Sequence, residues 1–197
     1  VRPGQEKGYP TELLGDPAAR CIGQTRARPF CLYVPFQGVH FPFQGPRDKA
    51  DRALGGDYWS DAKYGSRPDR RAAFAEMVES LDAAVGRILS ALKTQGLERD
   101  TFVFFTSDNG GFDMVSSNRP LRGAKGQLWE GGHRVPAIAS WPGHLAAGAV
   151  KPDAALTMDL FPTMAALAGA NRLPKLDGVN LMPWMKGTHG LPARTLF

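Results

Sequence analysis

The feature that most constrains the fold is a long amphipathic segment followed closely by a short, wholly apolar one. Between Asp69 and Lys93, apolar side chains recur every three or four residues, which predicts a helix with one buried face. Gly96 then stands where a left-handed C-terminal cap is expected. Residues 101–106 show no polar alternation, which is typical of a parallel strand covered on both faces.

Other apolar runs extend this pattern. Residues 30–34 predict a buried strand that would form a right-handed βαβ unit with the long helix and the strand after it. Residues 135–141 predict a third strand, and residues 9–24 a short helix. A further short helix is expected over 159–169, with Asp159 as its cap. The predicted class is α/β, with helices layered on a sheet.

Composition narrows the possible partners. The 197 residues suffice for one ordinary domain, and no apolar run approaches the roughly 18 residues of a membrane-spanning helix. The net charge of +5 permits an anionic ligand, but the basic residues are scattered, so we expect no nucleic-acid partner. The two cysteines, Cys21 and Cys31, are too few for a disulfide framework or a zinc site, and we expect both to be buried thiols.

Two polar loops follow predicted strands. Asp108 and Asn109 come after the strand at 101–106, and His40 lies in the loop after residues 30–34. Parallel strands would bring both loops to one sheet edge, where α/β proteins bind ligands. The carboxylate and amide oxygens of Asp108 and Asn109 suit calcium or magnesium, although Asn-Gly is also an ordinary turn signal.

Lys125 completes the candidate site. It lies between glycines in Leu121–Gly126, where the backbone and the ammonium group can approach an anion closely. A solvated loop lysine is the alternative interpretation. His40 is a candidate proton donor to a leaving group, against the alternative of a surface histidine. The hypothesis requires that His40, Asp108, Asn109 and Lys125 surround one small cavity.

Taken together, a series of motifs resembles the type I sulfatases, in particular the arylsulfatase A and N-acetylgalactosamine-6-sulfatase group. In chain order the motifs are Phe30–Pro42, Phe104–Gly111, Pro120–Gly126, Trp129–Pro136, Met158–Thr163 and Leu176–Val179. The resemblance implies an alkaline-phosphatase-like three-layer sandwich with a largely parallel central sheet, here incomplete. Residues from 1 to about 170 would belong to the catalytic core and about 171–197 to the start of a C-terminal subdomain, with both ends truncated.

The resemblance also implies a function, the hydrolysis of sulfate monoesters by a sulfuric ester hydrolase. Asp108 and Asn109 would be ligands of one Ca²⁺, Lys125 would hold sulfate oxygens, and His40 would contact the sulfate or protonate the leaving oxygen. The substrate would be a sulfated small molecule or glycan, and the compartment periplasmic, secreted or lysosomal. The chain's own N-terminal residues give no signal-peptide pattern.

One part of the family pattern is missing. The nucleophile of the family is a formylglycine made from Cys or Ser in a C/S-x-P-x-R motif, and it should precede Phe30. The 29 residues before Phe30 lack this motif, so we expect the nucleophile outside this chain and the chain alone to be inactive. Ser66–Arg70 matches the motif in letters but lies in the wrong order, and Pro68 beside Asp69 predicts a helix start instead.

Two alternatives stay open at this point. A phosphomonoesterase or phosphodiesterase of the alkaline phosphatase superfamily would share the geometry of the metal site, although such enzymes usually hold two transition metals with several Asp and His ligands. A non-catalytic basic module that binds anions would also agree with the charge and with the missing nucleophile.

Overall fold

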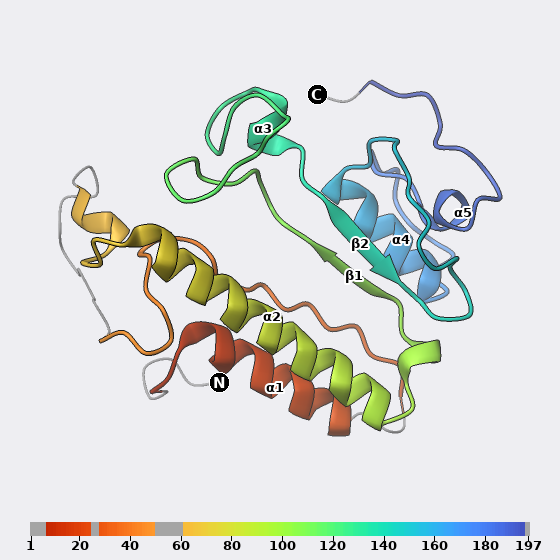
Figure 1. Cartoon of the computed structure of the whole chain (residues 1–197). Helices are drawn as coiled ribbons and strands as arrows, with labels where there is room; N and C mark the ends of the chain where they lie inside the picture. Colours follow the sequence, from red (N-terminus) through yellow and green to blue (C-terminus); the bar gives the residue numbers. More distant parts are fainter. Residues whose placement is uncertain (1–6, 25–27, 50–60, 196–197) are drawn as a thin grey trace. The chain divides into compact units, whose positions relative to one another are not determined.

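The computed structural model describes residues 7–24, 28–49 and 61–195, which form two compact units, Val1–Ala139 and Ser140–Phe197 (Figure 1). The elements of the first unit are α1 (Pro10–Gln24), η1 (Asp61–Tyr64), α2 (Arg70–Thr94), η2 (Glu98–Asp100), β1 (Val103–Thr106), α3 (Glu130–His133) and β2 (Ala137–Ser140), whose last residue opens the second unit. Those of the second unit are η3 (Thr157–Asp159), α4 (Leu160–Leu167) and α5 (Met182–Met185).

The long helix predicted from the apolar periodicity is confirmed as α2. The predicted buried face is only partly confirmed: Met77 and Leu92 of the apolar stripe are buried, whereas Val78 and Leu89 are 42% and 43% exposed. The other buried positions are the small residues Ala73, Ser80 and Ala84. The backbone after the helix turns at Gly96, whose φ of +68° is the left-handed conformation expected of a C-terminal glycine.

The helix predicted over 9–24 is confirmed as α1, which packs along α2 (Figure 1). The two backbones approach closely at Gly15, where an added Cβ would lie 2.8 Å from the Cβ of Ala84. At the rim of this interface, Arg87 Nε donates a hydrogen bond to Asp16 Oδ1 over 2.8 Å. The α1–α2 pair therefore forms the helical layer of the first unit.

The strands predicted over 101–106 and 135–141 are confirmed as β1 and β2; a parallel neighbour is expected only for the first, namely residues 30–34. The two strands pair with each other, and Thr106 Oγ1 at the end of β1 donates to the carbonyl of Pro136, just before β2, over 3.3 Å. The end of one strand thus lies beside the start of the other, so this pair is antiparallel. The coverage expected on both faces is not found among the described residues, because Phe105 of β1 is 42% exposed and Ile138 of β2 is 62% exposed.

The strand predicted over residues 30–34 is wrong for this structure. The segment has no strand pairing, and Tyr33 is 85% exposed. A strand needs a hydrogen-bonded neighbour, and the sheet found among the described residues pairs β1 with β2 alone. The predicted βαβ unit is therefore absent from the described part of the chain.

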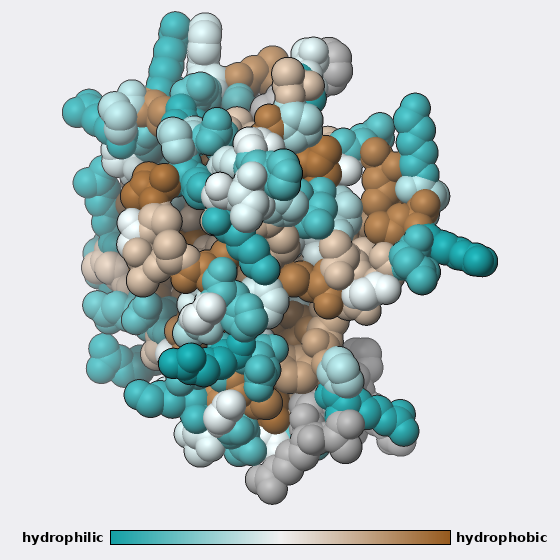
Figure 2. Space-filling model, turned by 90° about the vertical axis from the view of Figure 1, so that its right-hand side faces the viewer, coloured by the Kyte–Doolittle hydropathy of each residue, from teal (hydrophilic) through white to brown (hydrophobic). Residues whose placement is uncertain are grey.

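The prediction of two buried thiols is also wrong, because Cys21 and Cys31 are both exposed. Cys31 lies in the unpaired segment 30–34, and Cys21 lies one position off the buried stripe of α1. Other large apolar side chains are exposed as well, and Figure 2 shows such surface between hydrophilic side chains. Within the described residues, no helix has both the length and the apolar character needed to cross a bilayer.

In the second unit, the short helix predicted over 159–169 is confirmed as α4, and Asp159 occupies its N-cap position, but the fully buried Asp159 side chain makes no hydrogen bond to the helix. Its carboxylate instead accepts hydrogen bonds from the backbone amides of Leu156 (2.8 Å) and Val179 (2.9 Å). It also forms a two-pronged ion pair with Arg194, at 2.6 and 2.5 Å. The carboxylate therefore joins three chain segments that are distant in sequence.

The charge of Asp159 is compensated within this network. Burial alone would raise the pKa of its carboxyl, but the hydrogen bonds from Arg194 and from the two amides outweigh burial and lower the pKa below the usual range. The same contact raises the pKa of Arg194. Next to the carboxylate, Thr163 Oγ1 donates to the Asp159 carbonyl and accepts from the amide of Leu181.

Candidate active site

Asp108 and Asn109 lie directly after β1, in a turn closed by short-range hydrogen bonds. The hydroxyl of Ser107 donates to the Asn109 carbonyl over 2.9 Å, and Thr106 Oγ1 lies 3.1 Å from the Ser107 carbonyl. Asp108 is exposed and Asn109 half-buried. The sequence therefore folds as a tight turn that also leaves two side-chain oxygen groups accessible at the end of a strand.

The glycines after Asn109 fix this turn against α3. The amide of Gly110 donates to the carbonyl of Gly132 over 2.9 Å, and a Cβ on Gly110 would clash with the Gly131 carbonyl. The amide of Gly131 in turn donates to the carbonyl of Arg122 over 2.8 Å. Only residues without side chains allow three backbone segments to pack this closely.

Lys125 is joined to the same turn by its backbone. Its amide donates to the carbonyl of Gly111 over 3.1 Å, and its side chain is half-buried. Gly123 and Gly126 adopt φ of +88° and +85°, so the loop around Lys125 needs glycine on both sides. Side-chain Oε1 of Gln127 closes the loop by accepting from the Ala124 amide over 3.2 Å. The structure thus brings the segments of Asp108, Asn109 and Lys125 together.

His40 belongs to a loop that reaches the same region through aromatic packing. Its ring lies 4.1 Å from the ring of Phe41, and the rings of Phe41 and Phe43 lie 6.2 and 6.5 Å from that of Phe112. Phe112 directly follows Gly111, so the His40 loop packs on the segment next to the predicted metal ligands. The His40 side chain itself is exposed, and its Nδ1 donates to the Phe41 carbonyl over 2.8 Å.

Arg67 holds the His40 loop against α2. Its guanidinium contacts the carboxylates of Asp69 (2.7 Å), Glu76 (2.9 Å) and Asp48 (3.2 Å). These hydrogen bonds, with that of Asp69 the largest, raise the pKa of Arg67, and Arg67 lowers the pKa of Asp69. Asp48 also accepts from the Gly45 amide over 2.7 Å. Arg67 thus acts as a structural cation, in agreement with the helix-start interpretation of this segment.

The donor chemistry of the site fits a hard cation in type. Asp108 and Asn109 offer a carboxylate and an amide oxygen, the ligands that calcium prefers. Six to eight oxygens are usual around calcium, and the described residues contain no group of three or more His, Cys, Asp or Glu placed to hold a metal ion. Asp108 and Asn109 alone therefore do not complete the coordination sphere of a calcium ion.

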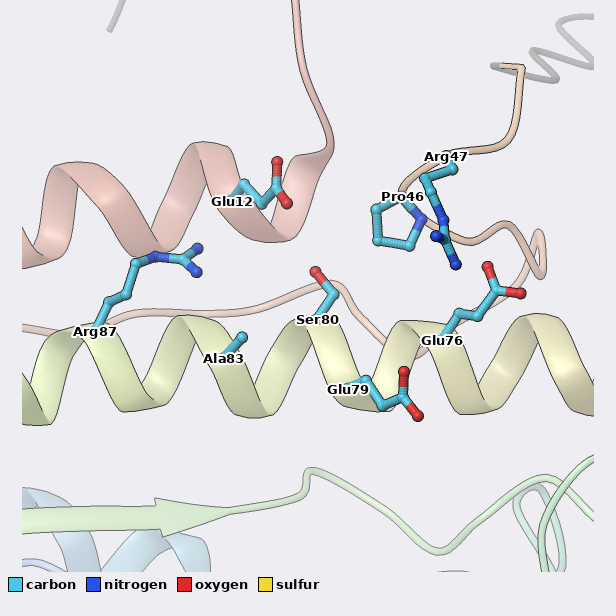
Figure 3. A pocket seen from close by; sticks show the side chains of 8 residues that line it. All are labelled: Glu12, Pro46, Arg47, Glu76, Glu79, Ser80, Ala83 and Arg87. Carbon is cyan, nitrogen blue, oxygen red and sulfur yellow. The ribbon is translucent and has the colours of Figure 1, made fainter.

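A cavity of about 300 Å³ lies elsewhere, between α1, α2 and the loop at 46–47 (Figure 3). Its lining consists of Glu12, Pro46, Arg47, Glu76, Glu79, Ser80, Ala83 and Arg87. None of the four predicted site residues lines it. Side chains of both charges surround it, which favours no single class of ligand.

Sequence reasoning missed one polar residue of the site, Asn118. Its side-chain amide bonds to Gly111 and Gly123, which flank the predicted metal ligands and Lys125 respectively. Asn118 lies in a polar loop between two glycine-rich motifs, and its distance in sequence from either motif matches no known pattern that would mark it as functional. Only the path of the loop in space reveals the contact.

Comparison with known proteins identifies the family to which these loops belong. The family model for Sulfatase matches residues 2–170. The chain belongs to the sulfatase family. This sulfatase chain is 40% identical over 189 residues to the steryl-sulfatase of Mus musculus, covering 90% of the chain and 28% of that relative. It is 38% identical over 204 aligned residues to the arylsulfatase A of Homo sapiens, covering 99% of the chain and 36% of that relative.

Comparison with solved structures shows that the fold is also similar to that of sulfatases. Ps i-CgsB, solved in complex with k-i-k-neocarrahexaose, superimposes with a TM-score of 0.76 at 32% identity, over 91% of this chain and 39% of that one. The alkaline-phosphatase-like α/β fold predicted from the motifs is thereby confirmed at the level of the fold family. This sulfatase chain spans about a third of the length of the relatives that it matches.

Proposed function

We propose that the protein containing this chain is a sulfuric ester hydrolase that cleaves sulfate monoesters. The observation that carries the proposal is the hydrogen bond from the Lys125 amide to the Gly111 carbonyl, in a chain of the sulfatase family. This bond joins a loop bearing an ammonium group to a turn bearing two oxygen ligands. A cation beside an anion-binding lysine is suited to a sulfate group, whose oxygens carry the negative charge that develops in hydrolysis.

Each predicted residue has a distinct role in this proposal. Asp108 and Asn109 hold one Ca²⁺, which when bound supplies positive charge for the sulfate oxygens. Lys125 binds those oxygens as a point charge on a short, glycine-flanked loop. We infer that the nucleophile, a formylglycine in this family, lies outside this chain.

The hydrogen bond of His40 assigns its two ring nitrogens. Nδ1 donates to the Phe41 carbonyl and so keeps its proton, which leaves Nε2 to face a ligand. In the protonated imidazole, Nε2 also carries a proton that can pass to the oxygen of the leaving alcohol. We therefore infer that the leaving oxygen approaches Nε2 of His40.

The substrate class and the setting of the whole protein are parts of the same proposal. We infer a sulfated small molecule or glycan, supported by the likeness to a protein solved with k-i-k-neocarrahexaose and to proteins named steryl-sulfatase and arylsulfatase A. A periplasmic, secreted or lysosomal location follows from the family resemblance alone. The oligomeric state is left open.

In the whole protein, we infer a three-layer sandwich with a largely parallel sheet. Residues from 1 to about 170 form part of its core, and about 171–197 begin a C-terminal subdomain. The exposure of Tyr33 (85%) and Ile138 (62%) supports this arrangement, because further strands and helices would cover such side chains.

The test is hydrolysis of 4-nitrophenyl sulfate by the full-length protein, with Lys125→Ala as the diagnostic variant and Lys93→Ala, on the exposed surface of α2, as the matched control. We expect turnover by the unsubstituted protein and by the control, and at least a hundredfold loss in kcat/KM for Lys125→Ala. Preferred cleavage of 4-nitrophenyl phosphate would favour a phosphatase. Sulfate binding without turnover that survives Lys125→Ala would favour a non-catalytic basic module.

A further inference from the structure

The side chain of Asn118 contacts both segments of the candidate site. Its Oδ1 accepts a hydrogen bond from the amide of Gly111 over 2.7 Å. Its Nδ2 donates to the carbonyl of Gly111 over 2.8 Å and to that of Gly123 over 3.3 Å. One planar carboxamide thus makes three hydrogen bonds to the backbones of two separate loops.

Both contacted glycines lie two residues from a predicted functional group. Gly111 follows Asn109 by two positions, and Gly123 precedes Lys125 by two. The carbonyl of Gly111 also accepts from the Lys125 amide, so the bridge and the direct bond between the loops share one acceptor. A shift of Asn118 would therefore change the position of Lys125 relative to the metal-ligand turn.

The site of contact is shaped for this residue. An added Cβ on Gly111 would press into Ser116 Oγ and lie 3.1 Å from Asn118 Oδ1, so these side chains would have to move aside. The bridge needs an acceptor on one arm of the side chain and two N–H groups on the other, which only a carboxamide supplies in this shape. Aspartate has the same shape but, when ionised, only accepts hydrogen bonds.

We propose that Asn118 is a positioning residue of the candidate active site, which fixes the separation between the Asp108–Asn109 turn and the Lys125 loop. It touches neither the cation nor the sulfate and acts through the two glycines. Its role toward sulfate rests on the proposed function, whereas the bridge itself is a property of the chain and is testable without turnover.

The bridge is tested by hydrogen exchange of backbone amides in the full-length protein, read by mass spectrometry on peptides covering 108–113 and 121–127. Asn118→Ala removes all three hydrogen bonds, so we expect exchange to accelerate at least tenfold in both peptides. The control is Ser116→Ala, which removes one hydrogen bond to the Phe112 carbonyl in the same loop and bridges nothing. Equal exchange in Asn118→Ala and Ser116→Ala at 121–127 overturns the proposal.

The positioning role is tested with Asn118→Asp, which keeps the shape of the side chain and the acceptor for the Gly111 amide. Above its carboxyl pKa it cannot donate to either carbonyl, so we expect the Kd of inorganic sulfate, measured by calorimetry, to rise at least tenfold at pH 7. As pH falls to about 4 the carboxyl takes up a proton and regains a donor, and the Kd should return toward that of the unsubstituted protein.

Ser117→Asp separates position from charge, because it places the same charge one residue away on an exposed side chain. We expect its Kd for sulfate to change less than threefold at pH 7. If Asn118→Asp and Ser117→Asp weaken sulfate binding equally, the positioning role is overturned. If the unsubstituted protein neither cleaves 4-nitrophenyl sulfate nor binds sulfate, the proposed function fails and the role toward sulfate fails with it, while exchange still decides the bridge.

Discussion

The backbone amide of Lys125 donates a hydrogen bond to the carbonyl of Gly111, over 3.1 Å. The bond closes a loop of 15 residues, from Gly111 to Lys125, and sets an ammonium-bearing side chain beside a turn with two oxygen ligands. The amide of Gly110, next to Gly111, also donates a hydrogen bond to the carbonyl of Gly132 and so ties the same turn to α3. Substitutions at these backbone contacts should disturb the geometry of the candidate site more than substitutions of equal size elsewhere in the chain.

Gly110→Ala should be strongly destabilising. The added methyl group would clash with the carbonyl of Gly131, which is backbone and cannot rotate away. We expect a loss of about 2–4 kcal/mol in the free energy of unfolding, measured by urea denaturation of the full-length protein.

Gly86→Ala is the matched control. Gly86 lies within α2, and nothing lies within 4 Å of an added Cβ there. Alanine is the better helix former, so this variant should gain about 0.5–1 kcal/mol. If Gly110→Ala and Gly86→Ala lowered the free energy of unfolding equally, the close packing described at Gly110 would be contradicted.

Arg194→Met should unfold more easily and should change the pH dependence of stability. The substitution leaves the fully buried carboxylate of Asp159 without its cation, which costs about 3 kcal/mol near neutral pH. Arg172→Met, at an exposed position with no ion pair among the described residues, is the control.

The sign of the pH effect follows from the lowered pKa of Asp159. In the unsubstituted protein its stabilising contribution is present above the unfolded pKa of about 4 and is lost as pH falls through the lower folded pKa. Without Arg194 the folded pKa rises toward or above the unfolded value, so the loss of stability on acidification should shrink or disappear. Denaturation curves between pH 3 and 7 measure this difference, and parallel curves for Arg194→Met and the unsubstituted protein would count against it.

Ser66 should carry no aldehyde in the full-length protein. Although the letters around it match the formylglycine motif, the next residue, Arg67, is engaged by three carboxylates that fix the start of α2. Tryptic mass spectrometry should find unmodified serine at this position and an aldehyde at a Cys or Ser outside the chain. An aldehyde at position 66 would reverse this assignment.

The sequence predicted those parts of the fold that depend on local pattern. The spacing of apolar residues marked α1 and α2, and uninterrupted apolar runs marked β1 and β2. The strand at 30–34, the exposure of Cys31 and the direction of β1 against β2 depend on which segments lie side by side, and no local pattern encodes that.

The candidate site shows the same division. Glycines around Asp108 and Lys125 are visible in the sequence because tight turns and close backbone contacts require them. The contacts of Asn118 and of Asp159 were not predicted, because each satisfies backbone groups brought close only by folding. Every residue has backbone groups, so a side chain that hydrogen-bonds to backbone has no partner of a particular residue type that could be recognised in the sequence.

The most direct test of the proposed site is a crystal structure of the full-length protein grown with calcium and inorganic sulfate. We predict one cation bound by oxygens of Asp108 and Asn109 at about 2.3–2.6 Å, with a sulfate beside it that contacts Lys125 Nζ and His40 Nε2. A structure in which these four side chains face different regions of the molecule, with sulfate bound at none of them, would contradict the proposal.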